Sequence, residues 1–242
     1  MENMNREGDS HPTVRLARYL AQRSEYSRRT CERLILDGRV SVNGKIVQDV
    51  AVQVDPASDE VRLDTLPLTV PASHLYIALN KPVGFLSSFS KQKERGRMLG
   101  ELVKVDRRLF TAGRLDRETS GLLLLTSDGD WANRAMHPRY EKEKEYVAIF
   151  RSISPETAVK RLKWASFKEK GRLFSLKDAK VQNGLVTLTL TEGRYHQIRR
   201  LAQSVELDLI VLIRIRIGSV RLGKLKVGSW RKLTMPEIES FR

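Results

Sequence analysis

Apolar positions along the chain fall in short runs that are separated by polar turns. Most of these runs have the length of about 4–8 residues that is typical of β-strands, and few helical patterns interrupt them. This order favours an α+β fold with a mixed, mostly antiparallel sheet over a doubly wound parallel one. The predicted strands are Leu75–Leu79, Leu122–Leu125, Glu145–Phe150, Phe174–Leu176, Leu185–Leu190 and Ile210–Ile217, and the predicted helices are Trp131–Met136 and Pro155–Trp164.

A different pattern occupies the N-terminal part of the chain. Apolar residues at helical spacing predict a short helix within Val14–Leu20 and a second one that begins after Ser27, as N-cap, and ends near Leu36. Val40–Lys45 then predicts a hairpin, because it contains the Asn-Gly pair that favours a tight turn. Two helices followed by a hairpin indicate a small separate module.

Composition sets the expected domain boundaries. Residues 1–12 are polar and lack periodicity, so we expect a disordered N-terminus. The small module then occupies residues 13–64. Two prolines mark residues 65–72 as a linker, and residues 73–242 form the larger domain.

Net charge indicates the class of partner. The chain holds 44 Lys+Arg against 29 Asp+Glu, and the resulting charge of +15 points to a polyanion. Residues 1–65 hold 10 basic and 11 acidic residues, so the excess lies in the larger domain. Within residues 13–45, however, basic residues outnumber acidic ones by 8 to 3. The sequence therefore predicts two basic surfaces, one small and one broad.

Other features weigh against competing classes. An anionic membrane is the rival partner, but no apolar run approaches the ~20 residues of a membrane span. The N-terminus lacks the apolar core of a signal peptide. Cys31 is the single cysteine, which excludes an internal disulfide and a cysteine-based zinc site, and the four histidines show no metal-ligand spacing. We expect a soluble cytoplasmic protein with no metal, acting as a monomer.

Candidate chemistry gathers just before the leucine run, in the segment Gly113–Gly121. Its sequence, GRLDRETSG, places Asp116 between two arginines in a turn bounded by glycines. A short loop on a buried strand is a common support for a catalytic carboxylate. The alternative is a surface hairpin in which Asp116 only pairs with Arg114 or Arg117, and spacing alone leaves both open.

This segment is one of four motifs that together resemble a known family. The set resembles RNA pseudouridine synthases, specifically the bacterial ribosomal RNA enzymes of the small-subunit type that carry an N-terminal S4 domain. The helix–helix–hairpin pattern of residues 13–45 resembles the S4 domain itself. The matching motifs, in the family's order, are Lys81–Gly84 (KPVG), residues 113–130 (GRLDRETSGLLLLTSDGD), Lys144–Val147 (KEYV) and Glu192–Arg200 (EGRYHQIRR).

The resemblance implies isomerisation of uridine to pseudouridine in ribosomal RNA, as part of ribosome biogenesis. The N1–C1′ bond breaks, the base rotates and C5 bonds to C1′, which is redox-neutral and needs no cofactor. Asp116 matches the family's essential aspartate, Arg199 the arginine that pairs with it, and Tyr146 the tyrosine that stacks on the uracil. Whether Asp116 attacks C1′, attacks the base or removes a ribose proton stays open; each route needs it ionised.

The resemblance also implies RNA contacts. The target uridine must be flipped out of its stack, and Arg114 matches the residue that fills the vacated place. Lys81 and Arg194 are expected to contact the RNA backbone. In the S4-like module, the expected RNA-binding residues are Arg28, Arg29 and Arg33 on the second helix. Their alternative role is a solvated helix face.

Two other function classes compete with the pseudouridine synthase. One is a non-catalytic RNA-binding factor for ribosome assembly, and the other is an S4-bearing RNA enzyme of different chemistry, such as a hydrolase. The presence of Asp116, Tyr146 and Arg199 disfavours the first, and the lack of a nucleotide-binding loop disfavours the second. One departure from the family pattern is that the glycine expected shortly after Arg200 is missing from Leu201–Leu207.

Overall fold

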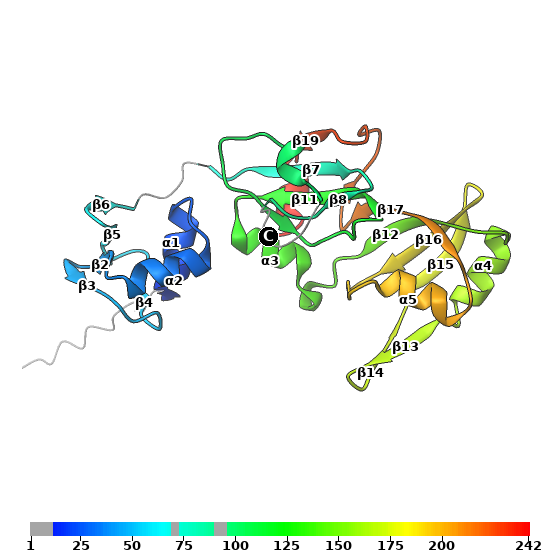
Figure 1. Cartoon of the computed structure of the whole chain (residues 1–242), viewed down its shortest axis with the longest axis horizontal. Helices are drawn as coiled ribbons and strands as arrows, with labels where there is room; N and C mark the ends of the chain where they lie inside the picture. The colour runs from blue at the N-terminus through cyan, green and yellow to red at the C-terminus, as the bar shows by residue number, and fades with distance from the viewer. Residues whose placement is uncertain (1–11, 69–72, 90–95) are drawn as a thin grey trace, which may run out of the picture. The chain divides into compact units, whose positions relative to one another are not determined.

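The computed structural model describes residues 12–68, 73–89 and 96–242, and the chain divides into two units, Met1–Ser73 and His74–Arg242 (Figure 1). Most of the predicted disordered N-terminus and residues 69–72 of the predicted linker lie outside the described residues. Each unit has its own hydrophobic core.

The first unit has the predicted order of two helices and a hairpin. Ser27 is the N-cap of the second helix, since its hydroxyl accepts a hydrogen bond from the backbone N–H of Thr30 at 2.9 Å. Cys31 is fully buried in the core between the helices and the small sheet. The elements are β1 Val14–Arg15, α1 Leu16–Arg23, α2 Arg28–Leu36, β2 Val40–Val42, β3 Lys45–Ile46, β4 Gln53–Val54, β5 Val61–Leu63 and β6 Leu66–Pro67.

The predicted Asn-Gly turn joins β2 to β3. Asn43 and Gly44 both have positive φ, 51° and 78°, as a two-residue turn of this type requires. β5 pairs with β2 and with β6, so Leu66 and Pro67 belong to the small sheet. The predicted linker of residues 65–72 therefore starts too early: Pro67 sits at the end of an edge strand, where its missing N–H costs nothing.

The second unit is built on a mixed sheet. In the described part of the chain, seven strands follow the order β15-β16-β12-β17-β11-β7-β19, with β10 paired to β11 and β18 to β17. All pairs in this sheet are antiparallel except that of β11 with β17. The strands are β7 Tyr76–Lys81, β10 Phe110–Ala112, β11 Ser120–Thr126, β12 Lys144–Phe150, β15 Asp178–Gln182, β16 Leu185–Leu190, β17 Leu209–Ile217, β18 Val220–Arg221 and β19 Trp230–Lys232.

The four leucines of β11 form a continuous apolar run because both faces of this strand are buried. Leu123 and Leu125 pack into one core, and Leu122 and Leu124 pack into the core on the opposite face of the sheet. Helices cover both faces, so every side chain of the run is buried whichever way it points. The helices are α3 Gly129–Met136 and α6 Met235–Glu239 over one face, and α4 Pro155–Leu162 and α5 Gln197–Ser204 over the other.

Smaller elements complete the second unit. Within the described residues no helix is both long and apolar enough to span a membrane. A hairpin of two strands stands apart from the main sheet and projects from it beside α5 (Figure 1). The smaller elements are β8 Phe85–Leu86, β9 Arg97–Met98, the 3₁₀ helices η1 Leu99–Glu101 and η2 Pro138–Tyr140, and the hairpin strands β13 Ser166–Glu169 and β14 Arg172–Ser175.

Candidate active site

The Asp116 segment is the loop of a hairpin between β10 and β11, and neighbouring chain holds it in place. The hydroxyl of Ser87 accepts a hydrogen bond from the Leu115 N–H at 3.0 Å and donates to the Leu115 carbonyl at 2.7 Å. Gly84 N–H donates to the Arg117 carbonyl at 2.8 Å. Contacts on both sides of Asp116 therefore fix the position from which its carboxylate is presented.

Gly121, the second glycine of the motif, lies where two strands approach closely. Its φ is +102°, and a Cβ built on it would lie 2.3 Å from the carbonyl oxygen of Arg214 on β17. No side chain fits there without displacing backbone. Glycine thus brings the base of the Asp116 loop directly against Arg214.

A cavity of about 430 Å³ opens in front of the loop. It is lined from six places in the sequence: the Asp116 loop, the end of α3, β12, the end of β16, the segment that leads into and starts α5, and β17. The polar residues that line it are Arg114, Asp116, Thr119, Lys144, Tyr146, Arg194, Tyr195, His196, Gln197, Arg199 and Arg214. Five of the six predicted site residues of the larger domain therefore share one cavity: Arg114, Asp116, Tyr146, Arg194 and Arg199.

Asp116 contacts His196, which was not predicted as its partner. His196 Nε2 lies 3.5 Å from Asp116 Oδ1, and both side chains are about a third exposed, at 34% and 30%. His196 has a positive φ of 51° just before α5, and its ring stacks on that of Tyr195 with centroids 3.9 Å apart. In the described part of the chain, no arginine pairs with Asp116 within 4 Å.

Arg199 lies beside the loop without reaching the carboxylate. Its Nη2 lies 3.5 Å from the hydroxyl oxygen of Thr119, three residues after Asp116. Its Nε is buried and has no hydrogen-bond partner among the described residues. The expected Arg199–Asp116 pair is thus absent from this structure, although the guanidinium borders the same cavity.

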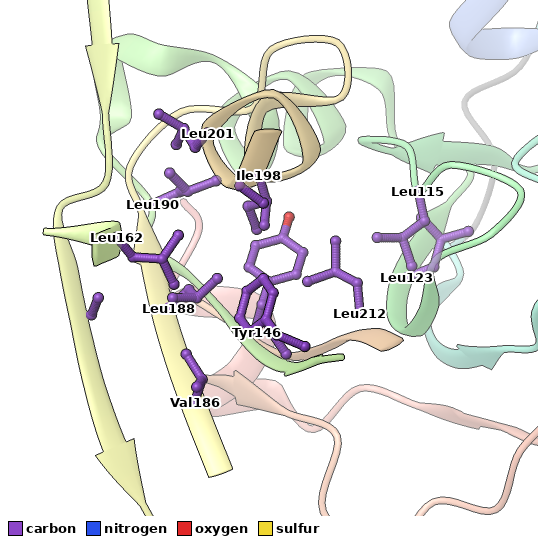
Figure 2. Close-up of a cluster of buried hydrophobic side chains, with 14 of the residues drawn as sticks. Leu115, Leu123, Tyr146, Leu162, Val186, Leu188, Leu190, Ile198, Leu201 and Leu212 are labelled. Carbon is purple, nitrogen blue, oxygen red and sulfur yellow. The ribbon is translucent and has the colours of Figure 1, made fainter. Parts of the chain in front are cut away.

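Tyr146 lies on β12 with only 7% of its surface exposed. Figure 2 shows its ring among Leu188, Ile198 and Leu212, with the hydroxyl oxygen pointing toward the helix that carries Ile198. The ring also lines the cavity. It is therefore a core residue, as expected by default for an aromatic residue on a strand, and it also forms part of the cavity wall.

Arg214 lines the cavity but was not among the predicted site residues. It is 3% exposed, and its Nε donates to the Leu122 carbonyl at 2.7 Å. Its Nη1 lies 3.4 Å from the Tyr146 hydroxyl and 3.5 Å from the Arg114 carbonyl. The signal was present in the sequence as an arginine within the apolar strand Leu209–Ile217, where a charge has to be paired or functional.

Lys81 does not lie where we predicted. It has no exposed surface, and its Nζ donates to the carbonyls of Pro82 and Phe85 at 2.9 and 2.8 Å. Burial lowers its pKa to about 8, although the nearby Asp116 and Glu118 oppose that shift. The predicted RNA-backbone contact is wrong, because a buried ammonium that closes a turn cannot reach a phosphate.

Lys144 is a second buried cation at the cavity. Burial, and then the positive charge of Arg214, lower its pKa to about 8. Its Nζ donates to the Lys142 carbonyl at 2.9 Å and lies 3.3 Å from that of Thr191. Together with Arg114, Arg194, Arg199 and Arg214, it gives the cavity lining more basic than acidic side chains.

Comparisons with known proteins agree with this geometry. The family model described as RNA pseudouridylate synthase matches residues 75–204, and that of the S4 domain matches residues 14–61. The chain belongs to the RNA pseudouridylate synthase family. It is an RNA pseudouridine synthase, an isomerase that converts uridine to pseudouridine in RNA.

Individual relatives of this pseudouridine synthase cover nearly its whole length. An uncharacterised RNA pseudouridine synthase of Aquifex aeolicus is 38% identical over 93% of this chain and 92% of its own. The ribosomal large subunit pseudouridine synthase B of Bacillus subtilis is 36% identical over 94% and 95%. The ribosomal small subunit pseudouridine synthase A of Yersinia pestis is 35% identical over 94% and 97%. A crystal structure of a pseudouridylate synthase has a TM-score of 0.65, 31% identity and coverage of 95% of this chain and 100% of that one.

Three buried nitrogens of the pseudouridine synthase cavity have no acceptor among the described residues: Gln197 Nε2, Arg199 Nε and Arg214 Nη2. Leaving a buried donor unpaired costs about 1–3 kcal/mol. Ordered water or a bound ligand can supply such missing acceptors. The family match and the relatives support the enzyme and give no support to the non-catalytic alternative.

The remaining predicted RNA-binding residues lie in the other unit. Arg28, Arg29 and Arg33 are all exposed on α2. Their side chains are thus available to a partner, on the unit that matches the S4 domain.

Proposed function

We propose that this enzyme isomerises a uridine of ribosomal RNA, with Asp116 as its catalytic carboxylate. The observation that carries the proposal is the cavity that Asp116 lines together with Tyr146, Arg199 and Arg214. Uracil is a flat ring with two carbonyl oxygens, and a phosphodiester adds further acceptors. Such a ligand matches the unpaired donors of Gln197, Arg199 and Arg214.

Asp116 acts on the nucleotide in its ionised form. The reaction breaks the N1–C1′ bond, turns the base, and joins C5 to C1′; the proton on C5 leaves and N1 gains one. A carboxylate fixed beside C1′ and C2′ can serve this sequence as a nucleophile or as a base. Arg199, whose Nη2 lies 3.5 Å from the Thr119 hydroxyl on the same loop, is the residue that we expect to pair with Asp116 when RNA displaces His196.

Tyr146 and Arg214 hold the base. The Arg214 guanidinium carbon lies 6.0 Å from the centre of the Tyr146 ring, and Nη1 lies 3.4 Å from its hydroxyl oxygen. A uracil ring stacked on Tyr146 would bring a carbonyl oxygen to the unpaired Nη2 of Arg214. We therefore assign Tyr146 to stacking and to the departure of the C5 proton, and Arg214 to orienting the base.

Arg114 and Arg194 serve the RNA around the target. The uridine has to leave its stack before its sugar can reach Asp116, and Arg114, two residues away on the same loop, can fill the vacated place. Arg194 lies at the cavity with 48% of its side chain exposed, so it can reach a phosphate.

The S4 unit supplies affinity and choice of substrate. Each of Arg28, Arg29 and Arg33 that contacts a phosphate should add about 0.7–0.9 to the slope of log affinity against log salt. A triple alanine variant should therefore bind ribosomal RNA more weakly and with a shallower slope. Unchanged affinity and slope would leave this face as a solvated helix surface.

Ribosomal RNA is the substrate class that the names of two relatives indicate, one for the large subunit and one for the small. We infer that the enzyme works as a monomer on ribosomal RNA or an assembling subunit in the cytoplasm. The direct experiment maps pseudouridines in ribosomal RNA from cells with and without the gene. We expect at least one pseudouridine to be lost and to return with the wild-type gene. Identical maps would contradict a ribosomal substrate.

A further inference from the structure

The β13–β14 hairpin carries two stacked aromatic rings on the face that lies toward α5. Phe167 and Phe174 are direct cross-strand partners, and their ring centres are 5.3 Å apart with planes 22° from parallel. Among the described strands, β13 and β14 pair only with each other, so side-chain contacts connect this hairpin to α5.

Three arginines lie against this aromatic pair. The guanidinium carbon of Arg200, on α5, lies 3.8 Å from the Phe167 ring centre. Those of Arg172, on β14, and Arg194, at the cavity, lie 5.2 and 5.1 Å from the Phe174 ring centre. We name Arg172, Arg194 and Arg200 the arginine strip.

Carboxylates oppose only part of the strip's charge. Arg200 pairs with Glu169 at 3.3 Å, and Arg172 and Arg194 share Glu192 at 3.5 and 3.9 Å. Lys168 and Lys170 of the same hairpin are exposed, so five cations face two carboxylates. The strip side chains stay 31–62% exposed, which leaves guanidinium N–H groups directed at solvent.

We propose that the arginine strip binds the backbone of the RNA strand next to the flipped uridine, and that the hairpin extends the RNA-binding surface outward from the active site. This proposal rests on the proposed function and adds the route that the RNA strand follows along the protein surface. Arg194 both lines the cavity and contacts Phe174, so the strip continues from the reacting nucleotide to the hairpin without a break. Aromatic support pre-orders the guanidinium groups, and their planar forks match phosphate geometry.

The test uses Arg172 and Arg200, which lie outside the cavity. Arg172→Gln with Arg200→Gln should weaken binding of unmodified ribosomal RNA transcripts and flatten the salt slope by about 1.4–1.8 between about 50 and 200 mM salt. The rate at saturating RNA should stay within about twofold of wild type, because Asp116 and its cavity are unchanged.

A matched control removes two other paired arginines of the same unit. Arg151 pairs with Asp208 at 2.7 Å and Arg221 with Glu145 at 3.9 Å, and neither lines the cavity or the strip. Arg151→Gln with Arg221→Gln gives the same net charge and should keep the wild-type slope. If the strip variant has the same salt slope of RNA binding as this control, the proposal is overturned. An acidic protein segment would then be the better ligand for the arginine strip.

A second variant separates charge from packing. Arg172→Lys with Arg200→Lys keeps the positive charge and loses the stacked fork, so it should retain most of the salt slope. If the lysine variant loses as much slope as the glutamine variant, the arginines only pack the hairpin and the proposal fails. Loss of activity in Asp116→Asn does not depend on the strip, so failure of either proposal can be recognised separately.

Discussion

His196 and Asp116 are in contact, with Nε2 3.5 Å from Oδ1, in the place that the family pattern assigns to Arg199. Both side chains are about a third exposed, so the pair contributes at most about 1 kcal/mol. Arg199 instead lies at Thr119 with a buried Nε that has no partner among the described residues. The structure thus shows the carboxylate held by a weak contact and the stronger cation close by.

The first prediction follows from this difference. His196→Gln should lower the turnover rate at saturating RNA by less than about tenfold, because a weak contact is lost. Arg199→Gln should lower it by at least about a hundredfold, because the proposed function needs this guanidinium beside the Asp116 loop. Single-turnover rates of both variants give the comparison. A larger effect of His196→Gln would make His196 the functional partner.

Arg214 should matter for turnover more than for RNA affinity. Arg214→Met removes a donor to the Leu122 carbonyl, which should cost about 1–3 kcal/mol of stability, and also removes the group that orients the base. We expect kcat to fall steeply with little change in KM. Arg214→Lys should restore only part of kcat, because lysine lacks the planar guanidinium group.

Arg216→Met is the control for Arg214, two positions along the same strand. Arg216 pairs with Glu143 and Glu145 at 2.9 and 3.2 Å and does not line the cavity. It should lower stability and leave kcat near wild type. Equal loss of kcat in both variants would show that Arg214 acts only through the fold.

Glu206 lies in the segment Leu201–Leu207, from which the glycine expected after Arg200 is missing. Its φ is +54°, a left-handed conformation that costs a residue with a Cβ about 1–2 kcal/mol. Glu206→Gly should therefore raise the free energy of unfolding by about 0.5–1 kcal/mol, after the extra chain entropy of glycine is counted. Glu206→Ala keeps the strain and should give no gain. Chemical denaturation measures both, and an equal gain from alanine would assign the effect to the lost carboxylate.

The second unit should become more stable as the pH rises from about 8 toward 10. Burial lowers the pKa of Lys144 from 10.5 to about 8, so in this window the unfolded chain binds more protons than the folded one. Tyr76, whose pKa is raised from 10.0 to about 12, opposes the trend only as the pH approaches 10, where the tyrosine of the unfolded chain begins to ionise.

Lys144→Met tests the pH effect. It should reduce the rise of the unfolding free energy with pH, and the part that remains should come from Lys81, whose pKa is also lowered to about 8. Lys160→Met changes an exposed lysine of α4 and should leave the rise as in wild type. A Lys144→Met profile parallel to that of wild type would contradict the assignment.

Local signals predicted much of the fold. The Ser27 cap, the Asn43-Gly44 turn and the run Leu122–Leu125 each depend on neighbours in sequence, and each forms as predicted. Short strands were missed because their partners are far away: β19 pairs with β7 about 150 residues earlier, and no local pattern encodes that pairing.

Site residues that stand in a motif could be predicted from the sequence. Whether a side chain is buried or reaches the cavity could not. Asp116, Tyr146 and Arg199 stand in recognisable motifs and share one cavity. Lys81 also stands in a motif, but only the fold shows that its ammonium is turned into the protein. Arg214 looks like one of two alternating arginines on a strand, and the close approach at Gly121 is what places it against the Asp116 loop.

The central claim is that the Asp116 carboxylate carries the reaction, and the release of tritium from C5 of uridine in unmodified ribosomal RNA tests it most directly. Asp116→Asn keeps the size of the side chain and removes the charge that each route requires. We predict RNA binding near wild type, because losing one acid from a basic unit does not weaken its attraction to a polyanion. We also predict tritium release at background, a loss far larger than a change in packing would cause. Tritium release near the wild-type rate in Asp116→Asn would contradict the account.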